Sequence, residues 1–219
     1  MKTYTSAGIV IKREKHLESD DRLIVFTKEW GRLLLNAKLS RRLFSKLRSV
    51  QEPFVEADFY FAMPEHAYYG RLISGKVIDS HQGLRNHLLA YGIASQCCEV
   101  INNLLPFRAP SPDVFDILRT VLRVIPHSQP RFLWVLFLRR FLWVLGHGDL
   151  TSNLMDLCPP QEKERWESHF HLEFENKDWG QAEFVSPVID QLTHFLEEKL
   201  MEIHPWKLKS NGLLLGLTH

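Results

Sequence analysis

Apolar and polar residues alternate in five short segments within the first 80 residues, and turn signals separate them. The clearest segment is Phe54–Phe61 (FVEADFYF), in which every second residue from Val55 onward is apolar. Glu56, Asp58 and Tyr60 fall on the other, polar face, so this segment is expected to be a strand with one wet side. The predicted strands are Thr5–Lys12, Arg22–Lys28, Arg32–Ala37, Phe54–Phe61 and Tyr68–Ile78. Short strands in this number, with an insertion between the third and the fourth, are typical of a small closed barrel such as the OB-fold.

Beyond residue 80 the apolar residues recur at helical spacing instead. Ser111-Pro112-Asp113 and Ser186-Pro187 are helix starts, and Gly146-His147-Gly148 is a helix end. The predicted helices are Leu84–Leu105, Pro112–Ile125, Arg131–Leu145, Ser186–Ile203 and Trp206–Leu217, and Asp149–Gly180 is expected to be irregular. The sequence therefore predicts an α+β protein of two domains, a five-stranded OB-fold barrel over residues 1–80 and an all-helical domain over residues 81–219.

The composition suits a globular chain whose basic character is local. Of the 219 residues, 45% are hydrophobic and 24% are charged, which is enough for a real core. The formal net charge is only +1, which excludes a strongly basic field over the whole protein. Residues 1–80 carry 14 Lys and Arg against 10 Asp and Glu, whereas the remainder carries 13 against 16. An anion-binding face is therefore expected in the N-terminal part.

Several protein classes do not fit the sequence. Three cysteines, Cys97, Cys98 and Cys158, are an odd set that does not form a disulfide framework, so a cytoplasmic location is expected. The most apolar run, Phe132–Leu145, is interrupted by two arginines and is too short to span a bilayer, and no signal-peptide pattern opens the chain. The nucleotide-binding, zinc-protease and hydrolase motifs are missing, so we expect no catalytic residue and no cofactor.

The stretch Gly31–Val50 is the strongest candidate for a binding site, because it holds six basic residues and no acid. Phosphates of a nucleic acid would neutralise such a cluster, although a solvated basic loop is the simpler interpretation. Tyr60, on the wet face of its strand, is a candidate for stacking on a base, and Tyr68 and Tyr69 also lie on a predicted strand. The predicted DNA-binding residues are Arg32, Lys38, Arg41, Arg42, Lys46, Arg48, Arg71, Lys76 and Tyr60.

Arg139 and Arg140 interrupt the apolar helix RFLWVLFLRRFLWVL and point about 100° apart. A buried arginine is costly unless it is paired or lies at an edge. One interpretation is that one arginine pairs with an internal acid while the other reaches solvent. The alternative places Arg140 at the rim of an apolar groove that accepts an acidic peptide with a hydrophobic end.

Several segments spread along the chain resemble the RecO family of bacterial recombination mediators. They are GIVIK, ESDDRLIVFTKEWGRL, the basic segment from AKLSRR to KLRSVQEPF, LGHG, and HPWKLKSNGLL. The resemblance implies an N-terminal OB-fold, a helical C-terminal domain, binding of single- and double-stranded DNA, and annealing of complementary strands. It also implies cooperation with RecR, contact with the acidic tail of single-strand DNA-binding protein, and loading of RecA in the nucleoid.

The same resemblance suggests partner-binding residues and one departure from the family. Arg140 matches an arginine often found at this place, Arg139 adjoins it, and Lys207 and Lys209 lie in the closing motif. Many RecO-like proteins carry a zinc site with CxxC pairs after the apolar helix. Here Cys158 fits the first position, but Gln161 occupies the second and no cysteine follows, so we expect no zinc.

Two other functions stay open at this point. An OB-fold binds RNA as readily as DNA, so the chain would also suit an RNA-binding adaptor. Alternatively, the helical domain would carry an enzyme of unknown chemistry. Strand annealing without turnover would separate the mediator from the enzyme, and competition between matched DNA and RNA would separate it from the adaptor.

Overall fold

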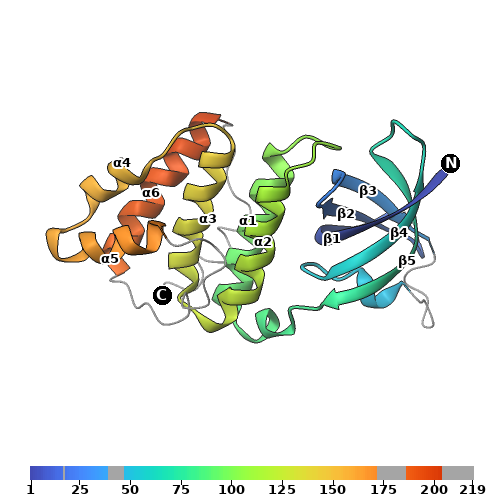
Figure 1. Cartoon of the computed structure of the whole chain (residues 1–219). Coiled ribbons are helices and arrows are strands. Elements are labelled where there is room, and N and C mark those ends of the chain that lie inside the picture. The colour runs from blue at the N-terminus through green and yellow to red at the C-terminus, as the bar shows by residue number, and fades with distance from the viewer. Residues whose placement is uncertain (17, 39–46, 172–185, 204–219) are drawn as a thin grey trace. The chain divides into compact units, whose positions relative to one another are not determined.

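The computed structural model describes residues 1–16, 18–38, 47–171 and 186–203 of the chain (Figure 1). The chain folds into two compact units. The barrel unit combines residues 1–85 with residues 98–115, and the helical unit contains the other described residues. The predicted helix Trp206–Leu217 lies outside the described residues.

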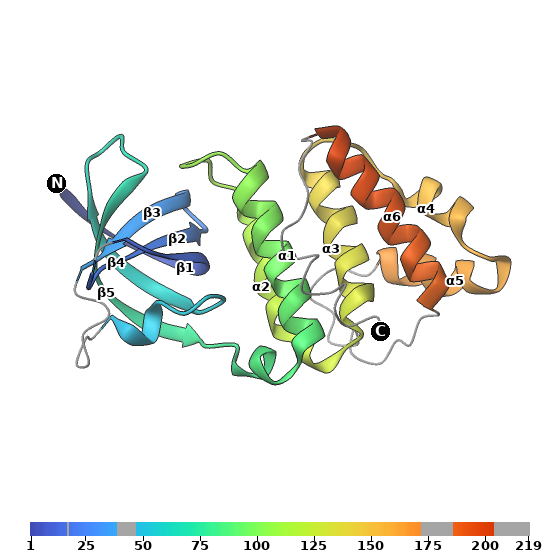
Figure 2. The same cartoon turned by 180° about the vertical axis from the view of Figure 1, so that it is seen from behind.

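Five strands close into a barrel in the order β1-β2-β3-β5-β4 (Figures 1 and 2). β3 and β5 pair in parallel, and the other four pairs are antiparallel. This arrangement confirms the predicted OB-fold, in which closure removes the exposed edges of an open sheet. The strands are β1 (Lys2–Lys15), β2 (Asp21–Thr27), β3 (Gly31–Ala37), β4 (Glu56–Met63) and β5 (Tyr69–Asp79), and a 3₁₀ helix, η1 (Arg48–Val50), precedes β4.

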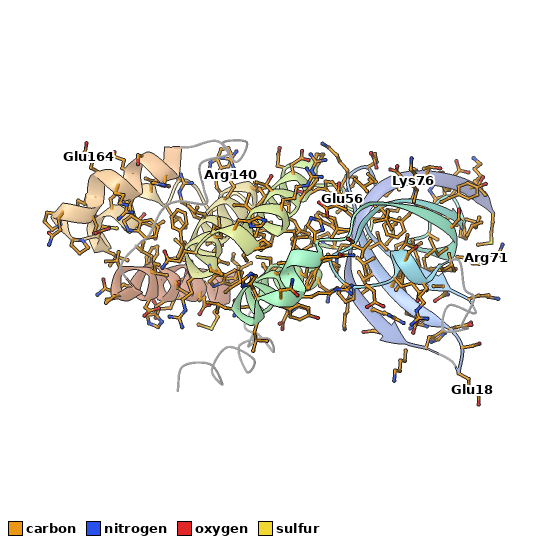
Figure 3. All side chains as sticks on the ribbon, turned by 90° about the horizontal axis from the view of Figure 1, so that it is seen from below. Glu18, Glu56, Arg71, Lys76, Arg140 and Glu164 are labelled. Atoms are coloured by element: carbon orange, nitrogen blue, oxygen red, sulfur yellow. The ribbon has the colours of Figure 1, made fainter. Side chains whose placement is uncertain are left out.

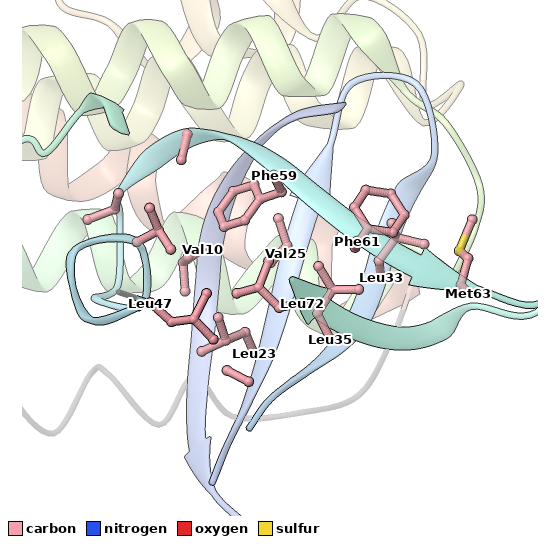
Figure 4. Packing of buried hydrophobic residues seen from close by; sticks show 14 residues of the cluster. Val10, Leu23, Val25, Leu33, Leu35, Leu47, Phe59, Phe61, Met63 and Leu72 are labelled. Atoms are coloured by element: carbon pink, nitrogen blue, oxygen red, sulfur yellow. The ribbon is translucent and has the colours of Figure 1, made fainter. Parts of the chain in front are cut away.

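The barrel encloses an apolar core to which every strand contributes (Figure 4). Phe59 and Phe61 are fully buried, as the alternation along β4 predicts. Glu56 differs from the prediction, because its side chain is 1% exposed instead of lying on the wet face. The register of β4 against β5 shifts between Glu56 and Ala57, and such a bulge re-aims the side chain beside it.

A returning segment completes the barrel unit. We call residues 105–110 the strap. Phe107 of the strap forms a parallel bridge with Arg32 of β3, and the Arg108 backbone N–H donates to the Arg32 carbonyl at 2.9 Å. A Cβ on Gly31 would lie 2.8 Å from the Ala109 backbone nitrogen and closer still to its carbonyl, and Gly31 has φ +66°. Only glycine fits here without strain.

The helical unit is built around α3 and α6, which pack on each other. α3 buries nine of its 15 residues, as its apolar sequence predicts. Trp134 Nε1 donates to Glu197 Oε1 at 3.0 Å across this contact, and burial raises the pKa of that carboxyl. The helices of the chain are α1 (Leu88–Leu104), α2 (Pro112–Val124), α3 (Pro130–Val144), α4 (Thr151–Leu157), α5 (Pro160–His171) and α6 (Ser186–Ile203), with 3₁₀ turns η2 (Gln82–Asn86) and η3 (Ile125–His127).

The end of α3 forms the predicted cap. Gly146 has φ +89°, its N–H donates to the Trp143 carbonyl at 3.0 Å, and the His147 N–H donates to the Leu142 carbonyl at 3.1 Å. These two bonds together make a Schellman motif, which satisfies carbonyls that the helix end would leave unpaired.

The prediction that Asp149–Gly180 is irregular was wrong for the described part, because α4 and α5 lie there. Each helix buries few large side chains, so the apolar period is weak; Trp166 is the fully buried residue of α5. The helix starts carry local signals instead. Asp149 Oδ1 accepts from the Thr151 N–H at 3.0 Å, and Pro160 begins α5 with Glu162 in its first turn.

Candidate nucleic-acid interface

Four described cations of the predicted DNA-binding set lie on the outside of the barrel. Lys38, Arg48, Arg71 and Lys76 are all exposed, and Figure 3 shows the last two projecting from the outer surface of β5. The remaining loop cations, Arg41, Arg42 and Lys46, lie outside the described residues.

The fold brings Arg48 to the same strand as Lys76. Val50 of η1 packs on Gly75 of β5, with Val50 Cγ1 3.1 Å from the position of a Cβ on that glycine. Arg48 lies at the exposed start of this short helix, and Lys76 is the exposed neighbour of Gly75. The end of the basic segment is therefore anchored at the strand that carries further cations.

Tyr60 lies on the outer face of the barrel beside these cations. Its side chain is 38% exposed, which confirms that β4 presents it to water. Across the strand pair Tyr60 faces Ser74, and the exposed Asp58 faces Lys76. The outer surface of β4 and β5 thus combines an aromatic ring with cations, an arrangement suited to a single strand, and contains one carboxylate opposite Lys76.

Arg32 is placed differently from the other predicted residues. Arg32 is buried, with 7% of its surface exposed. Its Nη1 donates to the backbone carbonyl of Asn102 and, at 2.9 Å, to the Asn102 side-chain oxygen. The guanidinium also lies 4.3 Å from the centre of the Phe107 ring. Burial lowers its pKa to about 10, so it remains charged at neutral pH. Because these contacts hold it inside the barrel unit, we leave Arg32 out of the proposed DNA surface.

Sequence reasoning missed Arg13, which bonds to Glu52 just after η1. Its Nη2 donates to Asp21 Oδ2 at 2.9 Å, and its Nη1 donates to Glu52 Oε1 at 2.7 Å. Asp21 is fully buried at the start of β2, whereas Glu52 lies between η1 and β4. Arg13 therefore ties the β1–β2 hairpin to the connection that carries η1. Sequence gives little sign of this, since Glu52 lies 39 residues after Arg13.

In the helical unit the two central arginines of α3 have separate surroundings. Arg139 Nη2 donates to Thr151 Oγ1 at 2.9 Å and lies 3.8 Å from Asp149 Oδ1. Burial lowers the pKa of Arg139, while the Asp149 charge raises it. Arg140 is half-buried, and its guanidinium lies 4.0 Å from the centre of the Trp143 ring, whose side chain is 47% exposed. Arg140 and Trp143 thus give α3 a cationic and aromatic outer edge.

The residues around Cys158 do not fit the zinc site that the resemblance suggested at this place. Cys158 is buried, and burial raises the pKa of its thiol, which opposes the thiolate form that binds zinc. Gln161 occupies the position of the second ligand. Within the described ranges, no three His, Cys, Asp or Glu side chains lie close enough to hold a metal ion. The absence of zinc stays a prediction.

Among the residues that the structure describes, no helix has both the length and the apolar character that crossing a membrane requires.

A closed OB-fold barrel with exposed cations and an exposed tyrosine, followed by helices, defines a class of nucleic-acid-binding folds. Comparison with protein families identifies the group within that class. Residues 1–81 match the Recombination protein O N-terminal family, and residues 85–148 match the Recombination protein O C-terminal family. The chain belongs to the RecO family.

Curated relatives carry the name DNA repair protein RecO. The protein of Syntrophobacter fumaroxidans is 28% identical over 154 residues, which are 70% of this chain and 61% of that protein. The protein of Listeria monocytogenes serotype 4b is 27% identical over 140 residues, which are 64% of this chain and 54% of that protein. The match thus spans little more than half the length of these relatives.

Proposed function

We propose that this chain is a DNA-binding recombination mediator and not an enzyme. In this role it binds single- and double-stranded DNA, anneals complementary strands, and helps load RecA onto strands coated by single-strand DNA-binding protein. RecR and the acidic tail of single-strand DNA-binding protein are the proposed protein partners, and Lys207 and Lys209, outside the described residues, are proposed contacts. Family membership together with the exposed cations of the barrel carries this proposal.

Electrostatics explains why such a barrel would accept both forms of DNA. Phosphates are exposed in single strands and in duplexes, and their neutralisation by Lys and Arg releases counterions in both cases. Lys38 lies in a turn, Arg48 in a 3₁₀ helix, and Arg71 and Lys76 on a strand, so none of these four described cations belongs to a groove-reading helix, and the binding is expected to be independent of sequence. A surface of this kind can hold two complementary strands near each other, which favours annealing.

The proposed function is tested by annealing of two complementary labelled oligonucleotides, with and without single-strand DNA-binding protein. The chain should speed annealing in both conditions, and matched RNA strands should compete less well than DNA. Failure to anneal would contradict the mediator role. Equal or better competition by RNA would favour the RNA-binding adaptor.

Replacing Arg48 and Lys76 together by Ala should weaken DNA binding equally across sequences. Each lost phosphate contact should make the slope of log affinity against log salt less negative, by about 0.7 on single strands and about 0.9 on duplex. Fluorescence anisotropy over a salt series measures both quantities. Arg123→Ala with Lys199→Ala removes the same charge from the helical unit and is the control. An unchanged slope in the Arg48 and Lys76 variant would contradict these contacts.

Replacing Arg140 by Glu should weaken binding of the acidic tail peptide of single-strand DNA-binding protein by about tenfold, because a cation beside an exposed ring becomes an anion. DNA binding by the barrel should not change. Anisotropy of a labelled tail peptide gives the affinity. Arg165→Glu, an exposed position on α5 with the same charge reversal, is the control. If both variants bind the peptide equally, Arg140 has only a structural role.

A further inference from the structure

Two half-exposed tyrosines at the start of β5 continue a series of ring contacts that begins inside the barrel unit. The buried Arg32 guanidinium lies 4.3 Å from the centre of the Phe107 ring. Phe107 stacks on Tyr68 with ring centres 4.7 Å apart and planes 29° apart, and Tyr68 meets Tyr69 edge-on at 5.8 Å. Tyr68 is 44% exposed and Tyr69 is 52% exposed. Well-anchored rings with this much exposure are candidates for recognition rather than for core packing.

The backbone that carries the two tyrosines is fixed on both sides. The Tyr68 carbonyl accepts from the Leu34 N–H of β3 at 2.8 Å, and the Ala67 carbonyl accepts from Arg108 Nη1 of the strap at 2.7 Å. A surface held in this way loses little conformational entropy when a ligand binds to it.

The charges around the tyrosines indicate which ligand they suit. Along β5, Tyr69 and Arg71 share the outer face, because Gly70 and Leu72 between and after them are buried. Lys76 lies further along the same strand and is exposed (Figure 3). The nearby Glu65 carboxylate is engaged with Lys2 Nζ at 2.8 Å. Aromatic rings alternating with cations match the alternation of bases and phosphates in an extended single strand.

We propose that Tyr68 and Tyr69 form a base-stacking platform that makes the barrel prefer unpaired DNA over duplex. The proposal rests on the proposed DNA binding and adds a selectivity that cations alone cannot supply. Phosphates are exposed in both forms of DNA, whereas base faces are accessible only in the unpaired strand. Stacking of one base on an aromatic side chain contributes about 1–3 kcal/mol, measured by alanine substitution.

The test compares a labelled oligo(dT) with a duplex of the same length, bound by the full chain at one salt concentration. In the Tyr68→Ala and Tyr69→Ala double variant, affinity for oligo(dT) should fall by about tenfold or more, while duplex affinity stays within about twofold. The salt slope should not change, because no cation is removed. The double Phe variant should retain the preference, because it keeps both ring faces. If the double variant folds poorly, Tyr69→Ala alone is measured in its place. It leaves the Tyr68–Phe107 stack intact and should show part of the loss in oligo(dT) affinity.

Each other result has a definite meaning. Equal losses for oligo(dT) and duplex, or no loss for either, would overturn the platform while leaving the proposed DNA binding intact. If the double variant no longer binds RecR or single-strand DNA-binding protein but keeps both DNA affinities, the tyrosines form a protein-binding surface. That result would also overturn the base-stacking platform. If the unmodified chain binds neither form of DNA, the proposed function fails and the platform fails with it.

Discussion

An Arg32→Ala variant should lose about 2–4 kcal/mol of unfolding free energy, although Arg32 belongs to a strongly basic segment. The substitution removes the donor to two oxygens of Asn102 and the cation over the Phe107 ring. The two Asn102 oxygens would then lose this donor in a partly buried place, and leaving such acceptors unsatisfied adds a desolvation cost to the lost hydrogen bonds. Urea unfolding followed by circular dichroism gives the free energy, and hydrogen exchange at β3 reports on the barrel unit alone.

Arg71→Ala is the matched control for this experiment. Arg71 faces Asn36 of β3 across the same sheet but is exposed, so its loss should change stability by no more than about 0.5 kcal/mol. The effects on DNA should be reversed, with Arg71→Ala binding less tightly and folded Arg32→Ala binding normally. If the two variants are equally stable and Arg32→Ala binds DNA poorly, Arg32 belongs to the DNA surface after all.

A Gly31→Ala variant should be destabilised by about 2–5 kcal/mol, because two separate costs combine at this residue. A left-handed φ of +66° costs a residue with a Cβ about 1–2 kcal/mol. The new Cβ would also collide with the backbone of Ala109, which cannot move aside as a flexible side chain can. Overpacking of this kind adds about 1–3 kcal/mol. Thermal and urea unfolding measure the total.

Gly146→Ala separates the two costs. Gly146 also has a positive φ, +89°, but nothing lies within 4 Å of the position of its Cβ. Its replacement should therefore cost only the backbone contribution of about 1–2 kcal/mol. If Gly31→Ala and Gly146→Ala are equally destabilised, the strap yields to the new methyl group and does not pack tightly on β3.

The sequence was sufficient for the barrel because its main signals are local. Alternation along β4 arises from the pleat itself, so Phe59 and Tyr60 were assigned correctly to opposite faces. The same holds for the end of α3, where Gly146 supplies the conformation that the cap requires. Glu56 was assigned to the wrong face, because the register shift beside it interrupts the alternation of buried and exposed residues.

The candidate site was harder to predict from the sequence, because contacts between distant residues determine which side chains are exposed. Arg32 was grouped with its neighbours by charge, yet Asn102 and Phe107, about 70 residues later, hold it inside the barrel unit. The exposure of Lys38, Arg48, Arg71 and Lys76 could be expected from their charge, whereas the packing of η1 on β5 could not. The packing of η1 on β5 leaves no periodic pattern in the sequence from which it could be predicted.

The strap has a consequence for synthesis of the protein, because the barrel unit is assembled from two separated stretches, residues 1–85 and 98–115. A ribosome adds about 5–20 residues per second, so the last strand precedes the strap by about 1–6 s. During that interval β3 lacks its Phe107 neighbour, and Arg32 lacks both Asn102 and the Phe107 ring. Unpaired strand edges invite association with other chains. Until the strap is made, the start of β3 around Arg32, which β5 does not pair, is therefore open to such association.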